Sequence, residues 1–136
     1  MRRSALIIGV GVDIVDLARV LKMIERYGKK FLGKTFTDGE IAYCTSRKAP
    51  VQHFAARFAA KEAVFKALGT GWREGMGWKE IEVQADAHGR PRIRLTGKAS
   101  IKARDLGIVE MHVSISHCDC HAIAHVVAES DDEEQQ

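Results

Sequence analysis

Two carboxylates stand in apolar stretches of this sequence, where an ionised side chain needs a compensating partner. Asp13 lies near the end of the apolar run at 6–14 (LIIGVGVDI), and Glu62 lies within RFAAKEAVFKALGTG at 57–71, a stretch patterned as a buried helix. An uncompensated carboxylate in such a place costs on the order of several kcal/mol. Two acids that converge from a strand and a helix suit Mg²⁺, which takes one or two protein carboxylates and completes its octahedron with water and phosphate oxygens. Asp13 and Glu62 are therefore candidate metal ligands.

A plain ion pair is the alternative interpretation of the same residues. Lys66 follows Glu62 at i,i+4 spacing and could hold it, while Asp13 could cap the helix that comes next. Spacing alone does not decide between the metal and the ion pair.

Basic and glycine-rich positions surround the two acids in the sequence and together predict a polyphosphate ligand. Lysine and arginine neutralise phosphate charge, and glycines let backbone amides approach it closely. Solvated surface charge and a helix terminator are the alternatives for most of these positions, although Lys61 and Lys66 share a helix face with apolar neighbours. The positions are Arg47, Lys48, Arg57, Lys61, Lys66, Gly69, Thr70 and Gly71.

The segment HCDCH at 117–121 is dense in side chains that bind zinc. It lacks the C-x₂-C spacing and the second ligand cluster of a structural zinc site, so a hairpin turn is the favoured interpretation. His117 directly follows the alternating strand at 111–116 (MHVSIS), where a strand end can meet a ligand. A turn residue with satisfied hydrogen bonds is the alternative for His117.

Hydrophobic periodicity places these residues on an α+β framework with a largely antiparallel sheet. The apolar run at 6–14 is typical of a strand covered on both faces. Its glycines at 9 and 11 do not form a dinucleotide fingerprint, because an acid and further strand follow where the helix should begin. The other expected elements are a helix from Asp16 to Gly28, a capping-box helix beginning at TDGE (37–40), a long helix over 51–68 ending at Gly69, a hairpin of strands 81–86 and 92–95, a helix of about ten residues ending at Gly107, and strands 111–116 and 122–127.

Composition fits one domain with a basic body. The chain has 136 residues, 46% of them hydrophobic, and a formal net charge of +3. Because the end at 130–136 (SDDEEQQ) is acidic, the remainder is more basic than the total and favours anionic partners. Nucleic acid is not favoured, since the basic residues come without interleaved aromatics or a recognised motif.

The cysteine content and the N-terminus both indicate the cytoplasm. Three cysteines, an odd number, do not form the framework of a small secreted disulfide protein. The start MRRSALIIGVGVDIV imitates a signal peptide, but Asp13 interrupts its apolar run and no cleavage pattern follows. No apolar stretch approaches the roughly 20 residues of a membrane span. We therefore expect a soluble cytoplasmic protein without a membrane partner.

Four segments occur together in an order and separation that identify a family. They are GVDIV at 11–15, FTDGE at 36–40, RFAAKEAVFKALGTG at 57–71 and HVSISH at 112–117. With them the chain closely resembles the holo-acyl-carrier-protein synthases, small bacterial 4′-phosphopantetheinyl transferases, over about residues 7–128. The resemblance implies the fold of that family, a mostly antiparallel sheet packed with a long central helix, in a single domain over 1–129. The acidic end at 130–136 has no counterpart in the family, and its composition predicts a disordered tail.

The resemblance also implies an activity and its site. The activity is Mg²⁺-dependent transfer of the phosphopantetheine arm from coenzyme A to a serine of apo-acyl carrier protein, with release of adenosine 3′,5′-bisphosphate, in support of fatty acid biosynthesis. It implies a homotrimer with sites between subunits. The implied residues are Asp13 and Glu62 at the metal, Lys66 with them in catalysis, Lys48 or Arg47 with Arg57 at the 3′-phosphate, Lys61 in supporting contacts to phosphate or carboxylate, Ser116 and His117 beside the nucleotide, Gly69, Thr70 and Gly71 along the coenzyme A cleft, and Arg19 and Arg26 at the carrier protein.

Two other classes of function remain open from the residues. One is a non-catalytic module that binds coenzyme A, a nucleotide or an acidic protein, although Asp13, Glu62 and Lys66 are all present. The other is a scaffold stabilised by zinc at the HCDCH segment, which would lose its fold on chelation.

Overall fold

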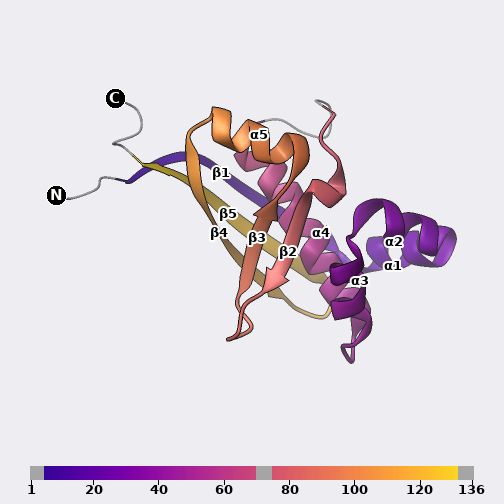
Figure 1. Cartoon of the computed structure of the whole chain (residues 1–136). Helices are drawn as coiled ribbons and strands as arrows, with labels where there is room; N and C mark the ends of the chain where they lie inside the picture. The colour runs from indigo at the N-terminus through magenta and orange to yellow at the C-terminus, as the bar shows by residue number, and fades with distance from the viewer. Residues whose placement is uncertain (1–4, 70–74, 132–136) are drawn as a thin grey trace.

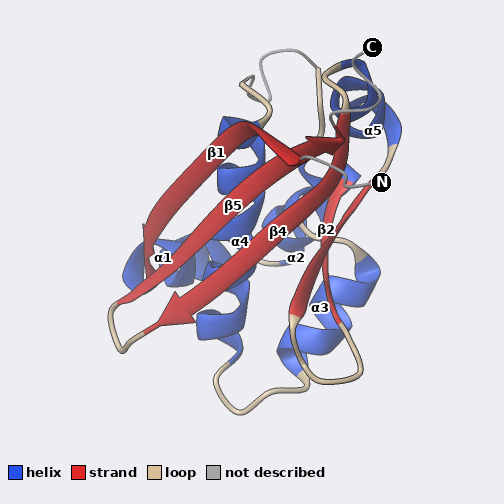
Figure 2. Cartoon of the chain, turned by 90° about the vertical axis from the view of Figure 1, so that its left-hand side faces the viewer, coloured by secondary structure: helices blue, strands red, loops and turns tan. Residues whose placement is uncertain are grey.

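A three-stranded antiparallel sheet lies across the long helix α4, with a two-stranded hairpin beside it (Figures 1 and 2). The structure is a computed structural model that describes residues 5–69 and 75–131. The strand order in the larger sheet is β1-β5-β4, so the first and last strands pair. The elements are β1 (Ala5–Asp16), α1 (Leu17–Tyr27), α2 (Lys29–Thr35), α3 (Asp38–Thr45), α4 (Pro50–Ala67), the 3₁₀ turn η2 (Trp78–Glu80), β2 (Ile81–Ala85), β3 (Pro91–Leu95), α5 (Gly97–Asp105), β4 (Ile108–His117) and β5 (His121–Asp131).

This architecture confirms the α+β prediction and most of the expected elements. The helices α1, α2 and α3 gather at one end of the molecule and α5 lies at the other (Figure 1). The short helix α2 was not expected from the sequence, because it has only seven residues and they carry no clear helical period. None of the helices in the described ranges combines the length and the apolarity that a membrane crossing requires.

Small residues let the sheet approach α4 closely. A Cβ atom at Gly9 would overlap the carbonyl oxygen of Ala67, and one at Gly11 would overlap that of Ala63. On the neighbouring strand β5 the buried positions facing α4 are also mostly small: Ala122, Ala124, Val126 and Ala128. The GVG segment therefore serves strand–helix packing, which explains two glycines in the middle of a strand.

The expectation that the first strand is covered on both faces is wrong for the single chain. Val10, Val12 and Ile14 project from the face of β1 opposite α4 and are 53%, 51% and 63% exposed. Figure 2 looks onto this open face, with α4 behind the sheet. Because β-branched residues in a row on an exposed face are unfavourable in water, the face calls for a covering partner.

The predicted boundary of the acidic tail is two residues too early. β5 continues through Ser130 and Asp131, which are 1% and 7% exposed. Ser130 pairs with Leu6 of β1 and Ile108 of β4, so the sheet holds it from both sides. The remaining tail, 132–136, lies outside the described residues.

Candidate active site

The predicted acids and the lysine come together where β1 crosses α4. Asp13 shares the inward face of β1 with Gly11, and the close approach at Gly11 sets it against the α4 turn that carries Glu62 and Lys66. Lys66 Nζ lies 3.1 Å from Asp13 Oδ1 and donates a 2.8 Å hydrogen bond to the carbonyl oxygen of Val12. The lysine thus bridges the helix to the strand.

The plain ion pair between Glu62 and Lys66 does not form. Within the described part of the chain, Lys66 pairs with Asp13 on the neighbouring strand instead. Asp13 is not a helix cap either, since it lies inside β1 opposite Ala124, and Asp16 occupies the N-cap of α1. The geometry therefore excludes both parts of the alternative, the ion pair between Glu62 and Lys66 and the helix cap at Asp13.

The surroundings of Glu62 disfavour the ionised form of its carboxylate. Its pKa is raised, first by desolvation and next by the negative charge of Asp13, while Lys66 and Arg19 act in the opposite direction. A raised pKa with a second acid close by is typical of carboxylates that bind a cation. Because the Lys66 side chain is 53% exposed, the site opens to solvent and to ligands.

The donor set fits a magnesium ion. Asp13 and Glu62 offer carboxylate oxygens from two rigid elements, and the open side leaves room for water and phosphate oxygens. Desolvation and then repulsion by Asp13 raise the pKa of Glu62, and a divalent cation between the two carboxylates would relieve that repulsion. Lys66 neutralises only part of this charge.

Lys61 does not lie at a ligand surface, and of the two contacts expected of it, with a phosphate or with a carboxylate, the structure shows the carboxylate. Its side chain is fully buried and forms a 2.7 Å ion pair with Glu40 Oε1. The ammonium group also donates to the carbonyl oxygens of Trp78, at 3.1 Å, and Ile81. With its three donors used inside the protein, Lys61 cannot reach a phosphate on the surface.

The acid that pairs with Lys61 is the one in the predicted capping box. Glu40 accepts the backbone amide of Thr37 at 2.9 Å, and Thr37 Oγ1 accepts that of Glu40 at 3.2 Å. Glu40 Oε2 accepts from the amide of Val83 on β2. The pair of Glu40 and Lys61 therefore joins α3, α4 and the hairpin, which the sequence pattern of the cap did not reveal.

A second group of site residues forms a cationic cluster at the start of α4. The guanidinium carbons of Arg57 and Arg47 lie 4.0 and 4.2 Å from the ring centroid of Tyr43. His53 packs between Tyr43 and His117, with ring centroids 5.9 and 6.1 Å away. The pKa of His53 is lowered by desolvation and then by Arg57, His117 and Arg47, so positive charge accumulates there.

Arg57 gives this cationic cluster its strongest indication of a ligand. It is only 6% exposed, and its Nε has no hydrogen-bond partner among the described residues. No carboxylate in the described ranges forms an ion pair with it or with Arg47. A buried, uncompensated guanidinium is costly unless an anion binds, and a phosphate matches its planar donors.

Sequence reasoning missed two members of the cationic cluster. His53 precedes Arg57 by four residues, so the i,i+4 spacing on α4 could have identified it. Tyr43 could not be found that way, because α3 and α4 meet only in the tertiary structure. Of the alternatives for the preceding loop, Arg47 is the residue that contacts the cluster, and Lys48 is exposed next to it.

The remaining predicted positions are less closely grouped. Ser116 and His117 are consecutive in β4, so their side chains point to opposite faces and only His117 reaches the cationic cluster. Gly69 ends α4 with a φ of 76°, which suits glycine. Thr70 and Gly71 lie outside the described residues.

The carrier-protein residues predicted on α1 line a shallow basic hollow. Arg19 and Arg26 border it together with Lys22, around Met23 and Tyr27, and its volume is about 470 Å³. Arg19 is close enough to influence the pKa of Glu62, so the hollow adjoins the paired acids.

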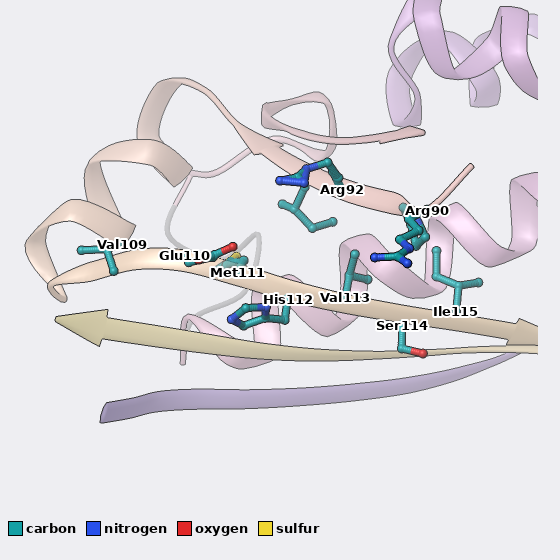
Figure 3. A pocket seen from close by; sticks show the side chains of 11 residues that line it. Arg90, Arg92, Val109, Glu110, Met111, His112, Val113, Ser114 and Ile115 are labelled. Carbon is teal, nitrogen blue, oxygen red and sulfur yellow. The ribbon is translucent and has the colours of Figure 1, made fainter. Parts of the chain in front are cut away.

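A groove of about 600 Å³ separates β4 from the hairpin (Figure 3). Its floor includes Val113 and Ile115, and its other wall carries Arg90 and Arg92. The last lining residue on β4 is Ile115, two residues before His117 of the cationic cluster.

The HCDCH segment does not form a zinc site in the structure. Among the described residues, the one group of three or more histidine, cysteine or carboxylate side chains close enough to share a metal ion is Glu110, His112 and Glu129, elsewhere on the sheet. His121 instead pairs with Asp16, and His117 faces His53. The segment is a tight turn between β4 and β5, as the hairpin interpretation predicts.

The chain belongs to the 4′-phosphopantetheinyl transferase superfamily, whose sequence model matches residues 9–123. Its relatives within that class include holo-[acyl-carrier-protein] synthases. The synthase of Koribacter versatilis is 46% identical over 124 residues, which cover 91% of this chain and 99% of that protein. The synthase of Ruminiclostridium cellulolyticum is 48% identical over 119 residues, which cover 87% of this chain and 89% of that protein.

Solved structures of the same enzyme class share the fold. The crystal structure of the holo-[acyl-carrier-protein] synthase of Neisseria meningitidis is 36% identical, with a TM-score of 0.83 over 90% of this chain and 98% of that one. The Helicobacter pylori synthase in complex with coenzyme A is 33% identical, with a TM-score of 0.78 over 88% of this chain and 98% of that one.

Proposed function

We propose that this chain transfers the 4′-phosphopantetheine arm of coenzyme A to a serine of apo-acyl carrier protein. The observation that carries the proposal is the convergence of Asp13, Glu62 and Lys66 at the crossing of β1 and α4, in a chain of this family. The serine oxygen attacks the phosphorus that bears the pantetheine, the pyrophosphate bond breaks, and adenosine 3′,5′-bisphosphate leaves. The product, holo-acyl carrier protein, serves fatty acid biosynthesis.

The chemistry requires positioning and neutralisation of charge more than covalent assistance from the protein. Asp13 and Glu62 would hold Mg²⁺, which supplies charge neutralisation at the pyrophosphate. Lys66 donates hydrogen bonds to phosphate oxygens and stabilises negative charge on the leaving group. Its hydrogen bond to the Val12 carbonyl fixes the ammonium group in place before the substrate binds.

The cationic cluster of Tyr43, Arg47, His53, Arg57 and His117 would bind the nucleotide end of coenzyme A. The unpaired Nε of Arg57 supplies a donor for a phosphate oxygen, and Lys48 adds charge at the rim. Gly69, Thr70 and Gly71, which follow α4 in the sequence, would line the path between the two ends of coenzyme A.

The basic hollow on α1 would receive the carrier protein. Arg19 and Arg26 favour an acidic surface, and their charge speeds association at low salt. Because Arg19 lies near Glu62, a serine delivered there arrives beside the paired acids.

We further propose a homotrimer in which neighbouring subunits share each site. The paired acids adjoin β1 and the cationic cluster adjoins β4, which are opposite edges of the sheet. The exposed Val10, Val12 and Ile14 provide an apolar face for a second copy. The three free cysteines suit the reducing cytoplasm, where both substrates would be found.

Intact-protein mass spectrometry tests the activity directly. An apo-acyl carrier protein is incubated with this protein, coenzyme A and Mg²⁺, with and without EDTA. We expect a gain of one phosphopantetheine mass that EDTA abolishes. The absence of any gain with several carrier proteins, while the folded chain still binds coenzyme A, would favour the non-catalytic binding module.

A further inference from the structure

The turn between β4 and β5 connects two parts of the candidate active site. The carbonyl oxygen of Cys120 accepts a 2.9 Å hydrogen bond from the amide of Leu17, the first residue of α1. His121 Nε2 lies 2.8 Å from Asp16 Oδ1 at the N-cap of the same helix. On its other side, the turn begins directly after His117. A change in this turn therefore reaches both α1 and the cationic cluster.

Two of the three cysteines lie in this turn and are accessible. Cys118 and Cys120 are free thiols and exposed, whereas Cys44 is free but buried. Burial raises the pKa of Cys44 to about 11, so its thiolate is scarce at neutral pH. The chain thus offers reagents one pair of accessible thiols and carries a buried thiol as an internal control.

The spacing of the exposed pair permits a disulfide. Two residues apart, their Cα atoms are separated by at most about 7 Å, and disulfides span about 4.4–6.8 Å. The chain bends at Asp119 and Cys120, which shortens the separation further. A ring this small is strained, and strained, exposed disulfides are labile rather than structural.

We propose that Cys118 and Cys120 are a reversible thiol–disulfide site that controls the geometry of the β4–β5 turn. The oxidant is a low-molecular-weight disulfide. One cysteine thiolate attacks a sulfur of that disulfide, forming a mixed disulfide and releasing one thiol. The second cysteine then attacks the protein-bound sulfur, closing the Cys118–Cys120 bond and releasing the other thiol. The protein loses two protons and two electrons, and the reagent gains both as it becomes two thiols.

Closing this bond changes the backbone of the turn. The hydrogen bond from the Cys118 amide to the His121 carbonyl, 2.9 Å in the reduced turn, closes the hairpin. Drawing the two side chains together competes with that bond and with the one from Leu17 to Cys120. The N-terminus of α1 and His117 then shift, and this effect on transfer rests on the proposed function.

The modification itself can be tested without any assay of activity. The full chain is treated with oxidised glutathione, and its mass and its thiols available for alkylation are measured under native conditions. We expect a loss of two hydrogen masses and of both exposed thiols, with a peptide map that joins Cys118 to Cys120 and leaves Cys44 reduced. Stable glutathione adducts on the wild-type chain, or disulfides between chains, would overturn the proposal.

Single serine variants supply the matched controls. Cys118→Ser and Cys120→Ser lack a second thiol in the turn, so each should retain one glutathione adduct that the wild-type chain resolves. Failure of both variants to retain the adduct would show that the turn thiols do not react. Both variants should carry out transfer normally in reducing buffer, because neither thiol contacts the paired acids or the cationic cluster.

The consequence for transfer is measured on the same samples. Oxidised wild-type protein should be slowed about tenfold or more, as expected of a displaced site, and dithiothreitol should restore it. If the disulfide forms and transfer is unchanged, the proposed effect of the disulfide on the active site is refuted, although the disulfide itself is established. If no sample transfers even when reduced, the proposed function fails, and the mass and peptide map still decide the thiol chemistry.

Discussion

At the level of single residues, the surroundings of Glu62 favour binding of a cation and lower the stability of the folded chain when the carboxylate is ionised. Its carboxylate is partly desolvated, faces Asp13, and has no ion pair with Lys66, which is engaged by the strand. The folded state consequently binds the Glu62 proton more tightly than the unfolded chain does. The free energy of unfolding should fall as the pH rises from the ordinary glutamate range through the raised pKa.

Glu62→Gln should separate function from stability. The amide keeps the shape of the side chain and removes its charge, so transfer should fall about 100-fold or more while the free energy of unfolding at neutral pH does not decrease. Activity is followed by mass spectrometry of the carrier protein and stability by urea unfolding. A variant that unfolds, with residual activity in proportion to its folded fraction, would return Glu62 to a structural role.

The pH profile of the wild-type protein provides an independent check on the same carboxylate. Because Mg²⁺ competes with the proton for Glu62, more Mg²⁺ should move the acid limb of the rate profile to lower pH. If the pH of the acid limb stays the same over a wide range of Mg²⁺ concentration, the assignment of Glu62 as a metal ligand is contradicted.

Two lysines five residues apart on α4 should respond in opposite ways to the same substitution. Lys61→Met leaves Glu40 buried without its partner and should cost about 3 kcal/mol or more, as broken buried pairs do. Lys66→Met removes a half-exposed partner and should cost less than about 1 kcal/mol, yet it should abolish transfer. Urea unfolding and the transfer assay on both variants measure the contrast, and equal loss of stability in the two would refute it.

At the scale of the element, the site depends on how closely β1 approaches α4. Gly11→Ala places a Cβ against the Ala63 carbonyl, and neither backbone can yield without separating strand from helix. We expect a loss of about 2 kcal/mol or more, and reduced transfer because Asp13 moves away from Glu62. Gly33→Ala is the control, since nothing lies within 4 Å of its Cβ in α2 and the change should stabilise by about 0.5–1 kcal/mol. A tolerated alanine at position 11 would mean that the crossing is looser than the structure shows.

The sequence predicts such elements well where one local pattern determines them. The capping box at Thr37 and Glu40, the end of α4 at Gly69 and the hairpin of β2 and β3 follow from short-range signals. The approach at Gly11 and the burial of Lys61 do not, because they depend on residues far away in the chain. The partner of Lys61 could not be predicted from the sequence, because a lysine in an apolar stripe fits a buried carboxylate as well as a phosphate.

At the scale of the whole molecule, the arrangement of the sheet bears on how many chains build one site. β1, with the paired acids, and β4, with the cationic cluster, are separated by β5. Strands lie about 4.8 Å apart, so these edges are about 10 Å from each other across the sheet. In a closed ring of three chains, an edge of one subunit meets a different edge of the next.

Mixing two inactive variants tests this sharing of sites. Glu62→Gln removes the charge of one paired acid and keeps Arg57, whereas Arg57→Met removes the buried guanidinium of the cationic cluster and keeps both acids. If neighbouring subunits share a site, random mixing in a ring restores a complete site at about one interface in four, so about a quarter of wild-type transfer should return. Light scattering on the mixture establishes its oligomeric state. If each chain carries a whole site, every site in the mixture contains one lesion, and activity stays at the level of the separate variants.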